Sequence, residues 1–367
     1  MSESLPAVRP TSSATRPADA VVVLMRRSRR RAAARITVLV VVLAVVAVAA
    51  MMIGPVSIAP TQVIGIVVDH LSGVRSGDWS ASADQIVWGT RAPRVAMGII
   101  AGAVLAAGGA VLQALVRNGL ADPYLLGINS GASTGVALVV LVIGGGALLF
   151  SGAALAGAIG AVLLVVALAG TASRRGPIRL VLAGLAVGYA LNAATSFLVF
   201  WSDSPEAARS VLFWLLGSLG SVQPVALAAA AVSAGLGLVT LVVIAPFIDA
   251  LASGDDSARS AGIDPERARL ALMVGVSAMV GVIVAAVGGV GFIGLVVPHL
   301  ARRLVGGRHR AVLPVSALLG AVLLVVADTV ARTVFAPQEI PVGVVTGVLG
   351  APFLLVLLRR TAPTSTH

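Results

Sequence analysis

The sequence predicts an all-α protein that crosses a lipid bilayer through about ten helices, and its composition and charge pattern support this. Of its 367 residues, 58% are hydrophobic and 11% are charged, whereas ordinary globular proteins carry about 25% charged residues. Long stretches carry no charge at all, and a helix of about 20 apolar residues spans a bilayer. These stretches are 36–68, 95–116, 123–173, 180–202, 210–248 and 270–301.

The apolar stretches divide into ten expected spans. They are 36–58, 95–116, 128–143, 147–170, 178–201, 222–246, 270–288, 291–304, 312–331 and 340–358. Glycines at 288, 289 and 291 separate the seventh span from the eighth, and Pro298 interrupts the eighth. Interrupted backbone at membrane depth needs protein or a water-filled cavity around it. These breaks therefore indicate either the lining of a pathway or kinked packing helices.

Arginine distribution orients the spans. With the amino terminus in the cytoplasm, the inside segments hold 19 arginines and the outside segments hold 5, leaving aside Arg9 and Arg16 in the tail. Such a bias follows the positive-inside rule. We expect a multi-pass protein of the cytoplasmic membrane with both termini in the cytoplasm, and anionic lipid rather than nucleic acid as the partner of these charges.

The first 35 residues differ from the rest. We expect residues 1–35 to form a disordered, basic cytoplasmic tail, 36–360 the membrane domain, and 361–367 a short carboxyl-terminal tail. Residues 47–49 resemble a signal-peptide cleavage site, but the apolar run continues to about Ile58. An uncleaved first span is the preferred interpretation.

Few polar side chains lie within the spans. Asp328 and Arg332 are four residues apart and share a helix face, which predicts a packing ion pair, a docking role for Arg332 or a proton relay. Asn192 and Thr195 lie within the fifth span, where they serve either interhelical hydrogen bonding or pathway lining. His299 has no second histidine or carboxylate at ligand spacing, so no metal site is expected.

The longest polar segment on the predicted inner side is 249–269. Asp255 and Asp256 lie between Gly254 and Gly262, with Arg259 four residues after Asp255. Acidic residues in a first helical turn and a basic residue in the last suit the helix dipole. The segment therefore predicts a short cytoplasmic helix, which is either a solvated connector or a surface on which a soluble partner acts.

From Arg91-Ala92-Pro93-Arg94 onward, the sequence resembles the FecCD-type permeases of bacterial iron-siderophore, haem and cobalamin ABC importers. The resemblance covers roughly 36–360 and rests on many ordered blocks. These are Gly102, Gly108, Gly109, Gln113 and residues 117–123, 125–132, 182–184, 214–219, 254–262, 291–299, 327–332, 339–347 and 350–352.

The resemblance implies a ten-span subunit that pairs with a second permease copy or a paralogue. A cytoplasmic ABC ATPase dimer and an extracytoplasmic substrate-binding protein complete the importer. The implied ATPase-coupling residues are Ser253, Gly254, Asp255, Asp256, Ser257, Ala258, Arg259 and Gly262. The implied residues that dock the binding protein are Arg91, Arg94 and Arg332. The implied path lies between the two permeases along the fifth and tenth spans, with Asn192, Thr195 and Thr346 as weaker candidates for its lining.

This chain is not expected to be an enzyme. It has no P-loop sequence, so it cannot bind ATP through a P-loop. We expect no cofactor on this chain, and the resemblance implies that ATP and Mg belong to the partner ATPase. The expected substrate is a ferric siderophore, with haem or cobalamin as alternatives. A cation-coupled secondary transporter is a different class of function, as is a membrane scaffold or receptor. The secondary transporter would need intramembrane carboxylates, and the expected spans offer only Asp328.

Overall fold

The computed structural model describes residues 17–74, 77–143, 147–169 and 178–361, and within these ranges it contains helices and no strands. Seven helices are long and apolar enough to cross a membrane. They are α1 (Pro17–Met52), α4 (Ala92–Val116), α6 (Ala147–Ala169), α7 (Ile178–Trp201), α9 (Pro224–Val243), α12 (Pro265–Val287) and α14 (His309–Ala331).

Three further helices correspond to the remaining predicted spans. They are α5 (Ile128–Leu138), which continues as the π-helix η3 (Val139–Ile143), α13 (Ile293–Val305) and α15 (Val342–Thr361). Each of the ten predicted spans has a helix in the described residues, and the all-α membrane fold is confirmed.

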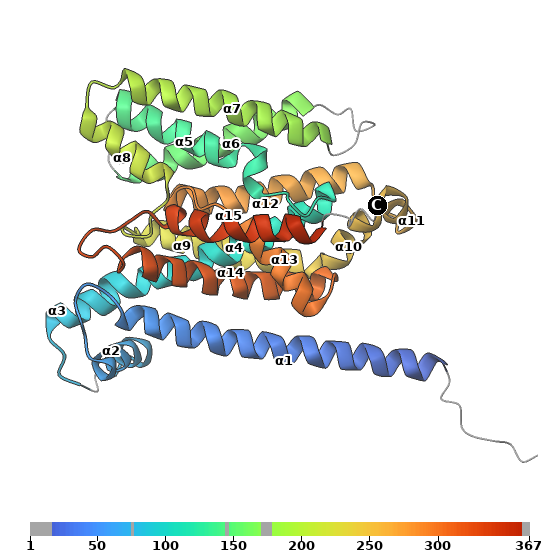
Figure 1. Ribbon diagram of the computed structural model, residues 1–367, viewed down its shortest axis with the longest axis horizontal. Helices are drawn as coiled ribbons and strands as arrows, with labels where there is room; N and C mark the ends of the chain where they lie inside the picture. Colours follow the sequence, from blue (N-terminus) through green and yellow to red (C-terminus); the bar gives the residue numbers. More distant parts are fainter. Residues whose placement is uncertain (1–16, 75–76, 144–146, 170–177, 362–367) are drawn as a thin grey trace, which may run out of the picture.

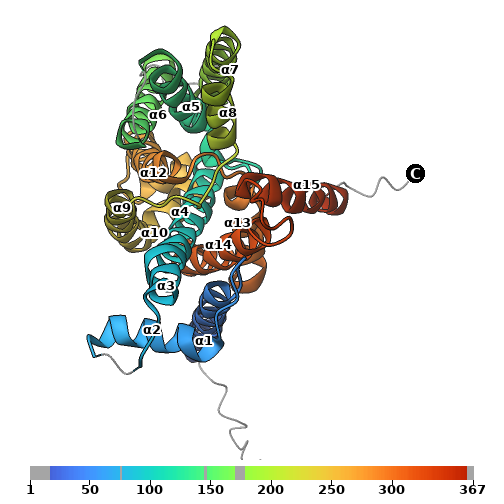
Figure 2. The ribbon, with the colours of Figure 1, turned by 90° about the vertical axis from the view of Figure 1, so that its left-hand side faces the viewer.

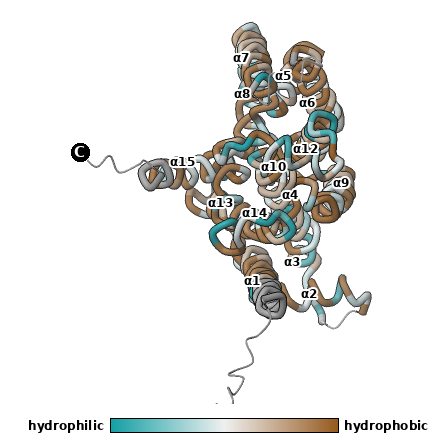
Figure 3. Tube along the Cα trace, turned by 90° about the vertical axis from the view of Figure 1, so that its right-hand side faces the viewer, coloured by the Kyte–Doolittle hydropathy of each residue, from teal (hydrophilic) through white to brown (hydrophobic). Residues whose placement is uncertain are grey.

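The spanning helices run along the long axis of the molecule (Figure 1). The short helices α2 (Pro60–Ser72), α3 (Ala81–Asp84) and α8 (Pro205–Leu215) lie at one end, which we call the outer end. The opposite end, called the inner end, holds α11 (Asp255–Ser260), the amino end of α1 and the carboxyl end of α15. Hydrophilic stretches gather at the inner end in the segments that join the spans (Figure 3).

Two predicted boundaries were wrong. Helix α1 begins at Pro17, so residues 17–35 of the expected tail are helical, while 1–16 and 362–367 lie outside the described residues. The second span was expected to begin at 95, but α3, the π-helix η1 (Gln85–Arg91) and α4 form one continuous helix from Ala81 to Val116. Arg91 and Arg94 therefore lie within this helix. The prediction began the span after Arg94 because it was based on charge-free runs.

Helix α4 forms the centre of the molecule (Figure 2). It is buried almost without interruption from Ala101 to Leu115 and contacts α9, α12, α13 and α14. Close contact with α14 and α13 depends on glycines in α4. A Cβ at Gly102 would overlap the backbone carbonyl of Gly320 in α14, and one at Gly109 would overlap that of Gly294 in α13. Small residues let helices approach in lipid, where packing drives their association.

The Gly102→Val variant should therefore lose about 1–3 kcal/mol of stability, because overpacking a filled interface forces the backbones apart. Gly235→Val in α9 is the matched control, since a Cβ at Gly235 meets no atom within 4 Å. The measurement is the temperature at which detergent-solubilised protein stops eluting as a single species. An equal drop for both variants would mean that close packing of α4 is not the cause.

Candidate functional site: the inner helix and the outer arginine cluster

Helix α11 projects at the inner end between two glycines in positive-φ conformations, Gly254 at 130° and Gly262 at 76°. Ser253 ends the preceding helix, α10 (Ala245–Ser253). Asp255 and Asp256 form the first turn of α11 and Arg259 its last turn. The predicted short helix bounded by glycines is confirmed in position and polarity.

The two aspartates of α11 have different surroundings. Asp255 accepts a hydrogen bond from Arg269 of α12 at 2.9 Å and also pairs with Arg117, which ends α4. The Asp256 side chain is fully exposed and pairs only with Arg259, at 3.1 Å, among the ion pairs of the described residues. Asp255 thus fastens α11 to two spanning helices, while Asp256 and Arg259 face outward.

The hydrogen bond from Arg269 lowers the pKa of Asp255, and the positive charges of Arg269, Arg117 and Arg259 lower it further. A carboxyl group whose pKa is lower in the folded state contributes stability above its ordinary pKa, and this contribution is lost as the pH falls through the lowered value. The attachment of α11 is therefore fully charged at neutral pH and weakens only in acid.

A second set of contacts joins α4 to α13 near the inner end. The Gln113 amide donates to the backbone carbonyls of Gly294 and Leu295, each at 3.2 Å, and Arg302 donates to the Gln113 carbonyl oxygen. Gln113 is 3% exposed. Burying its amide group without these hydrogen-bond partners would cost folding free energy. The central helix is thus held by polar contacts to α13 as well as to α11.

At the outer end, Arg94 is the centre of a buried ion-pair cluster. Its Nε and Nη2 donate to the Asp328 carboxylate of α14 at 2.9–3.1 Å, and its Nη1 donates to Glu339 at 2.9 and 3.0 Å. Arg94 and Asp328 are 7% and 3% exposed. This paired geometry is the strongest arrangement that a guanidinium and a carboxylate form.

The other two predicted docking arginines bind backbone carbonyls at the end of α1 and just beyond it. Arg91 donates to Met51 at 2.7 Å, to Met52 at 3.2 Å and to Val56. Arg332 donates to Ala50 and lies 3.9 Å from Asp328. The bonds to Ala50, Met51 and Met52 satisfy carbonyls that the end of a helix leaves without partners.

The expected Asp328–Arg332 pair is therefore only the weaker half of the cluster, because the main partner of Asp328 is Arg94. The spacing of four residues could not reveal a partner 234 positions away. The structure places Arg91, Arg94 and Arg332 together at the outer end but buries them and joins them to α1 and α14. Their docking role stays a prediction.

The three weaker pathway candidates lie on two helices, Asn192 and Thr195 on α7 and Thr346 on α15. Asn192 is exposed on α7. Thr195 is 4% exposed, and its hydroxyl lies 2.9 Å from that of Thr134 in α5. Thr346 is 3% exposed and donates to the Gly343 carbonyl at 3.1 Å. Asn192 alone of the three is exposed, and the threonines serve helix contacts.

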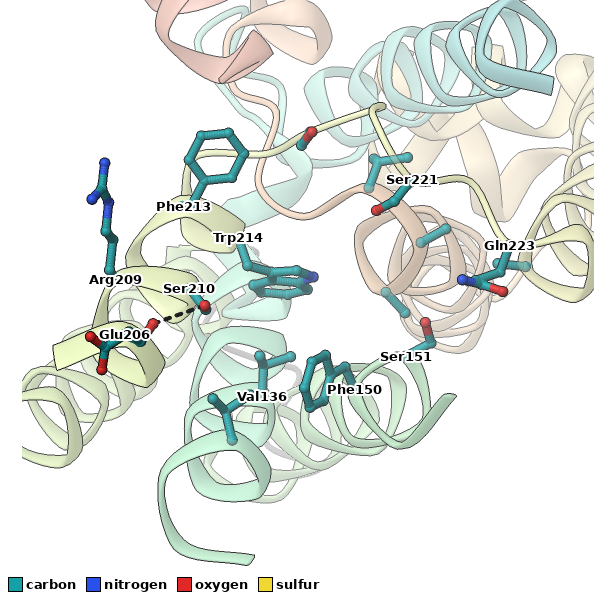
Figure 4. A pocket seen from close by; sticks show the side chains of 16 residues that line it. Val136, Phe150, Ser151, Glu206, Arg209, Ser210, Phe213, Trp214, Ser221 and Gln223 are labelled. Atoms are coloured by element: carbon teal, nitrogen blue, oxygen red, sulfur yellow. Dashed lines mark hydrogen bonds between the residues drawn. The ribbon is translucent and has the colours of Figure 1, made fainter. Parts of the chain in front are cut away.

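Sequence reasoning missed a cavity of about 530 Å³ at the outer end, between α5, α6, α8 and the end of α12. Its lining mixes the aromatic rings of Phe150, Phe213 and Trp214 with polar side chains such as Ser151 and Gln223 (Figure 4). Trp214 belongs to the block 214–219 that carries the resemblance, which was the one signal available. The lining suits a ligand with both apolar and hydrogen-bonding groups.

The fold has the architecture of an ABC importer permease. A solved structure of an inward-facing transporter, assigned to the metal-chelate type of ABC transporters, matches with a TM-score of 0.78 and 27% identity. The match covers 89% of this chain and 98% of the other. The chain belongs to the FecCD transport family, whose model matches residues 40–360.

Relatives in this family have different named substrates. The cobalamin import permease of Halobacterium salinarum is 41% identical over 281 residues, covering 75% of this chain and 74% of the relative. The Fe(3+)-citrate import permease of Bacillus subtilis is 37% identical over 287 residues, covering 77% and 84%. The hemin transport permease of Yersinia pestis is 39% identical over 293 residues, covering 77% and 86%.

Because Arg94 neutralises Asp328 in a buried site, the Arg94→Gln variant should lose about 3–5 kcal/mol of stability by removing the main partner of that carboxylate. Arg209→Gln on α8 is the control, since Arg209 is an exposed arginine at the same end. Thermal unfolding in detergent measures both variants in the absence of any partner protein. An Arg94 variant as stable as the control would contradict the structural role.

Proposed function

We propose that this permease carries a ferric-siderophore complex across the cytoplasmic membrane. It would act as one of two permease subunits, with a cytoplasmic ABC ATPase dimer and an extracytoplasmic substrate-binding protein. The observation that carries the proposal is α11, an attached helix whose solvent-facing side is exposed, at the inner end where α1 begins and α15 ends. Haem and cobalamin are the alternative substrates within the family.

The attachment of α11 supports a coupling role. A helix that only connects two spans needs no ion pairs to two different helices. Asp255 joins α11 to Arg117 of α4 and to Arg269 of α12, so a partner that displaces α11 also displaces the inner ends of these spans. The exposed Asp256 and Arg259 would contact that partner, and the cytoplasmic ATPase fits because the predicted orientation puts α11 inside.

The filled centre of the chain supports a second permease copy. Helix α4 occupies the axis of the molecule and is buried on all sides, so a large chelate has no route through the middle of one subunit. Helices α7 and α15 lie on the flank of the molecule (Figure 2), and Tyr189 and Asn192 of α7 are exposed. A path between two copies would use this flank, with Asn192 among the residues that line it.

The support for docking of a binding protein at the outer end comes only from the arginine charges there. Arg91, Arg94 and Arg332 give this end its positive centre, and Glu339 is the partly exposed acid paired to it. An acidic side chain of the binding protein would compete with Glu339 for Arg94. Such complementary charge speeds association more than it strengthens binding.

The ion pair of Asp328 argues against a cation-coupled secondary transporter. Such a transporter needs a carboxylate that takes up and releases a cation, whereas Asp328 is held by Arg94 through both oxygens. In the proposed importer, ATP with Mg binds the partner ATPase, and closure of that ATPase favours one state of the permease. The ATPase can shift the equilibrium between two permease conformations only through a difference in its affinity for them.

Cells lacking this chain should lose uptake of a radiolabelled ferric siderophore and keep uptake of haemin and cobalamin. Re-expression of the wild-type chain is the control and should restore uptake. Loss of haemin or cobalamin uptake instead would contradict the proposed substrate but not the proposal that the chain is an importer permease. Uptake by the purified chain alone in liposomes under a proton gradient would overturn the importer itself.

The two aspartates of α11 should separate coupling from binding. Asp255→Asn weakens the ion pairs to α4 and α12, so the ATPase should still co-purify while uptake falls by about tenfold, which corresponds to about 1.4 kcal/mol. Asp256→Arg changes only the exposed surface and should reduce ATPase co-purification. Asp255→Glu, which keeps the charge, should retain most uptake. Identical behaviour of the Asn and Arg variants would contradict separate roles for the two residues.

A further inference from the structure

Helix α2 follows the outer end of α1 and has no counterpart among the predicted spans. It runs across the direction of the spans, beside α1 and at the edge of the molecule (Figures 1 and 2). One face of α2 packs inward through Val63 and Ile66, which are 1% and 0% exposed. The opposite face touches nothing in the described part of the chain that would bury it.

That outward face is apolar. Ile64, Val68 and Leu71 are 50%, 50% and 75% exposed. Their spacing of four and three residues places them in one stripe on an α-helix. The two ionisable residues of α2, Asp69 and His70, are turned toward the inward side. A helix facing water would carry polar residues on its outward face, so the stripe predicts a nonaqueous neighbour.

Two aromatic contacts fix the rotation of α2 about its axis. Trp79 packs on Gly65, where a Cβ would overlap the indole, and donates from Nε1 to Asp69 at 2.7 Å. His70 stacks on Trp88 of η1, with ring centroids 4.4 Å apart, and lies 2.8 Å from Asp84. The stripe cannot turn inward without breaking both contacts.

We propose that α2 is an interfacial helix that lies in the outer leaflet of the bilayer, with Ile64, Val68 and Leu71 inserted at the boundary between headgroups and acyl chains. Helices of this kind bury their apolar face about 5–10 Å into that boundary. Trp79 and Trp88 lie beside it, and tryptophan is enriched at membrane interfaces. The ligand of this surface is phospholipid.

Continuity with α1 favours lipid over a protein partner. Only 6% of the spanning window of α1 is buried inside the molecule, and its exposed side chains include Val41, Val45 and Val48. Lipid therefore already covers the helix from which α2 emerges. Helix α15 lies on a different flank from α2 (Figure 2), so a second copy packed along α15 would leave α2 at the edge of the assembly.

The chain contains no cysteine, so single-cysteine variants can be spin-labelled without further changes. Ile64→Cys, Val68→Cys and Leu71→Cys would be reconstituted in phosphatidylcholine–phosphatidylglycerol vesicles. Collision rates would be measured with oxygen, which concentrates in lipid, and with a water-soluble nickel chelate. The proposal predicts high oxygen and low nickel accessibility at all three positions.

Val45→Cys on α1 provides the lipid-facing reference, and Ser82→Cys on α3 provides the water-facing one. Gln62→Cys is the matched control on α2, because a position two residues from Ile64 lies on the opposite side of the helix and Gln62 is exposed. It should resemble Ser82. Nickel accessibility along the stripe equal to that at Ser82 would overturn the proposal. Shielding of the stripe from both reagents would also overturn it, in favour of a protein partner.

Discussion

The structure depends on one constraint: inside a bilayer no water is available for backbone groups where a helix is broken. The chain meets it by bringing its breaks together. The backbone amide of Ser218 donates to the carbonyl of Val287 at 2.8 Å, and the amide of Val342 donates to the carbonyl of Gly217 at 3.0 Å. The Tyr124 hydroxyl accepts from the Val290 amide at 2.9 Å and donates to its carbonyl at 3.1 Å. Breaks far apart in sequence thus satisfy one another, which fixes where α12 ends and where α13 and α15 begin.

The same constraint explains why α4 can stand at the centre. An unbroken helix satisfies its own backbone, so glycines 102 and 109 can be used for close approach to α13 and α14 rather than for turns. Its polar side chains are placed near its two ends, where Arg94 binds Asp328 and Gln113 binds α13. One rigid element therefore carries the contacts of the outer cluster and those of the inner end.

The sequence predicted the ten spans and the short helix at 255–260 because both depend on local composition: charge-free runs of spanning length and glycines on either side of two aspartates. It could not predict the partners of Arg94 and Asp255, because each ion pair joins different helices and only packing selects it. Helix α2 was missed for a related reason. Its two apolar stripes look like part of a long charge-free run, and only the observed burial separates the stripe that packs on protein from the one that does not.

These contacts define a route from the inner helix to the flank of the molecule under the proposed function. Asp255 fastens α11 to Arg269 near the start of α12, and α12 runs unbroken to the turn at Gly288. That turn lies against Gly217, whose carbonyl in turn holds Val342 at the start of α15. Under the proposed function, a displacement of α11 would be passed along this helix to the place where the breaks meet. Since that place positions the beginning of α15, the flank assigned to the transport path is the surface that the displacement would reach.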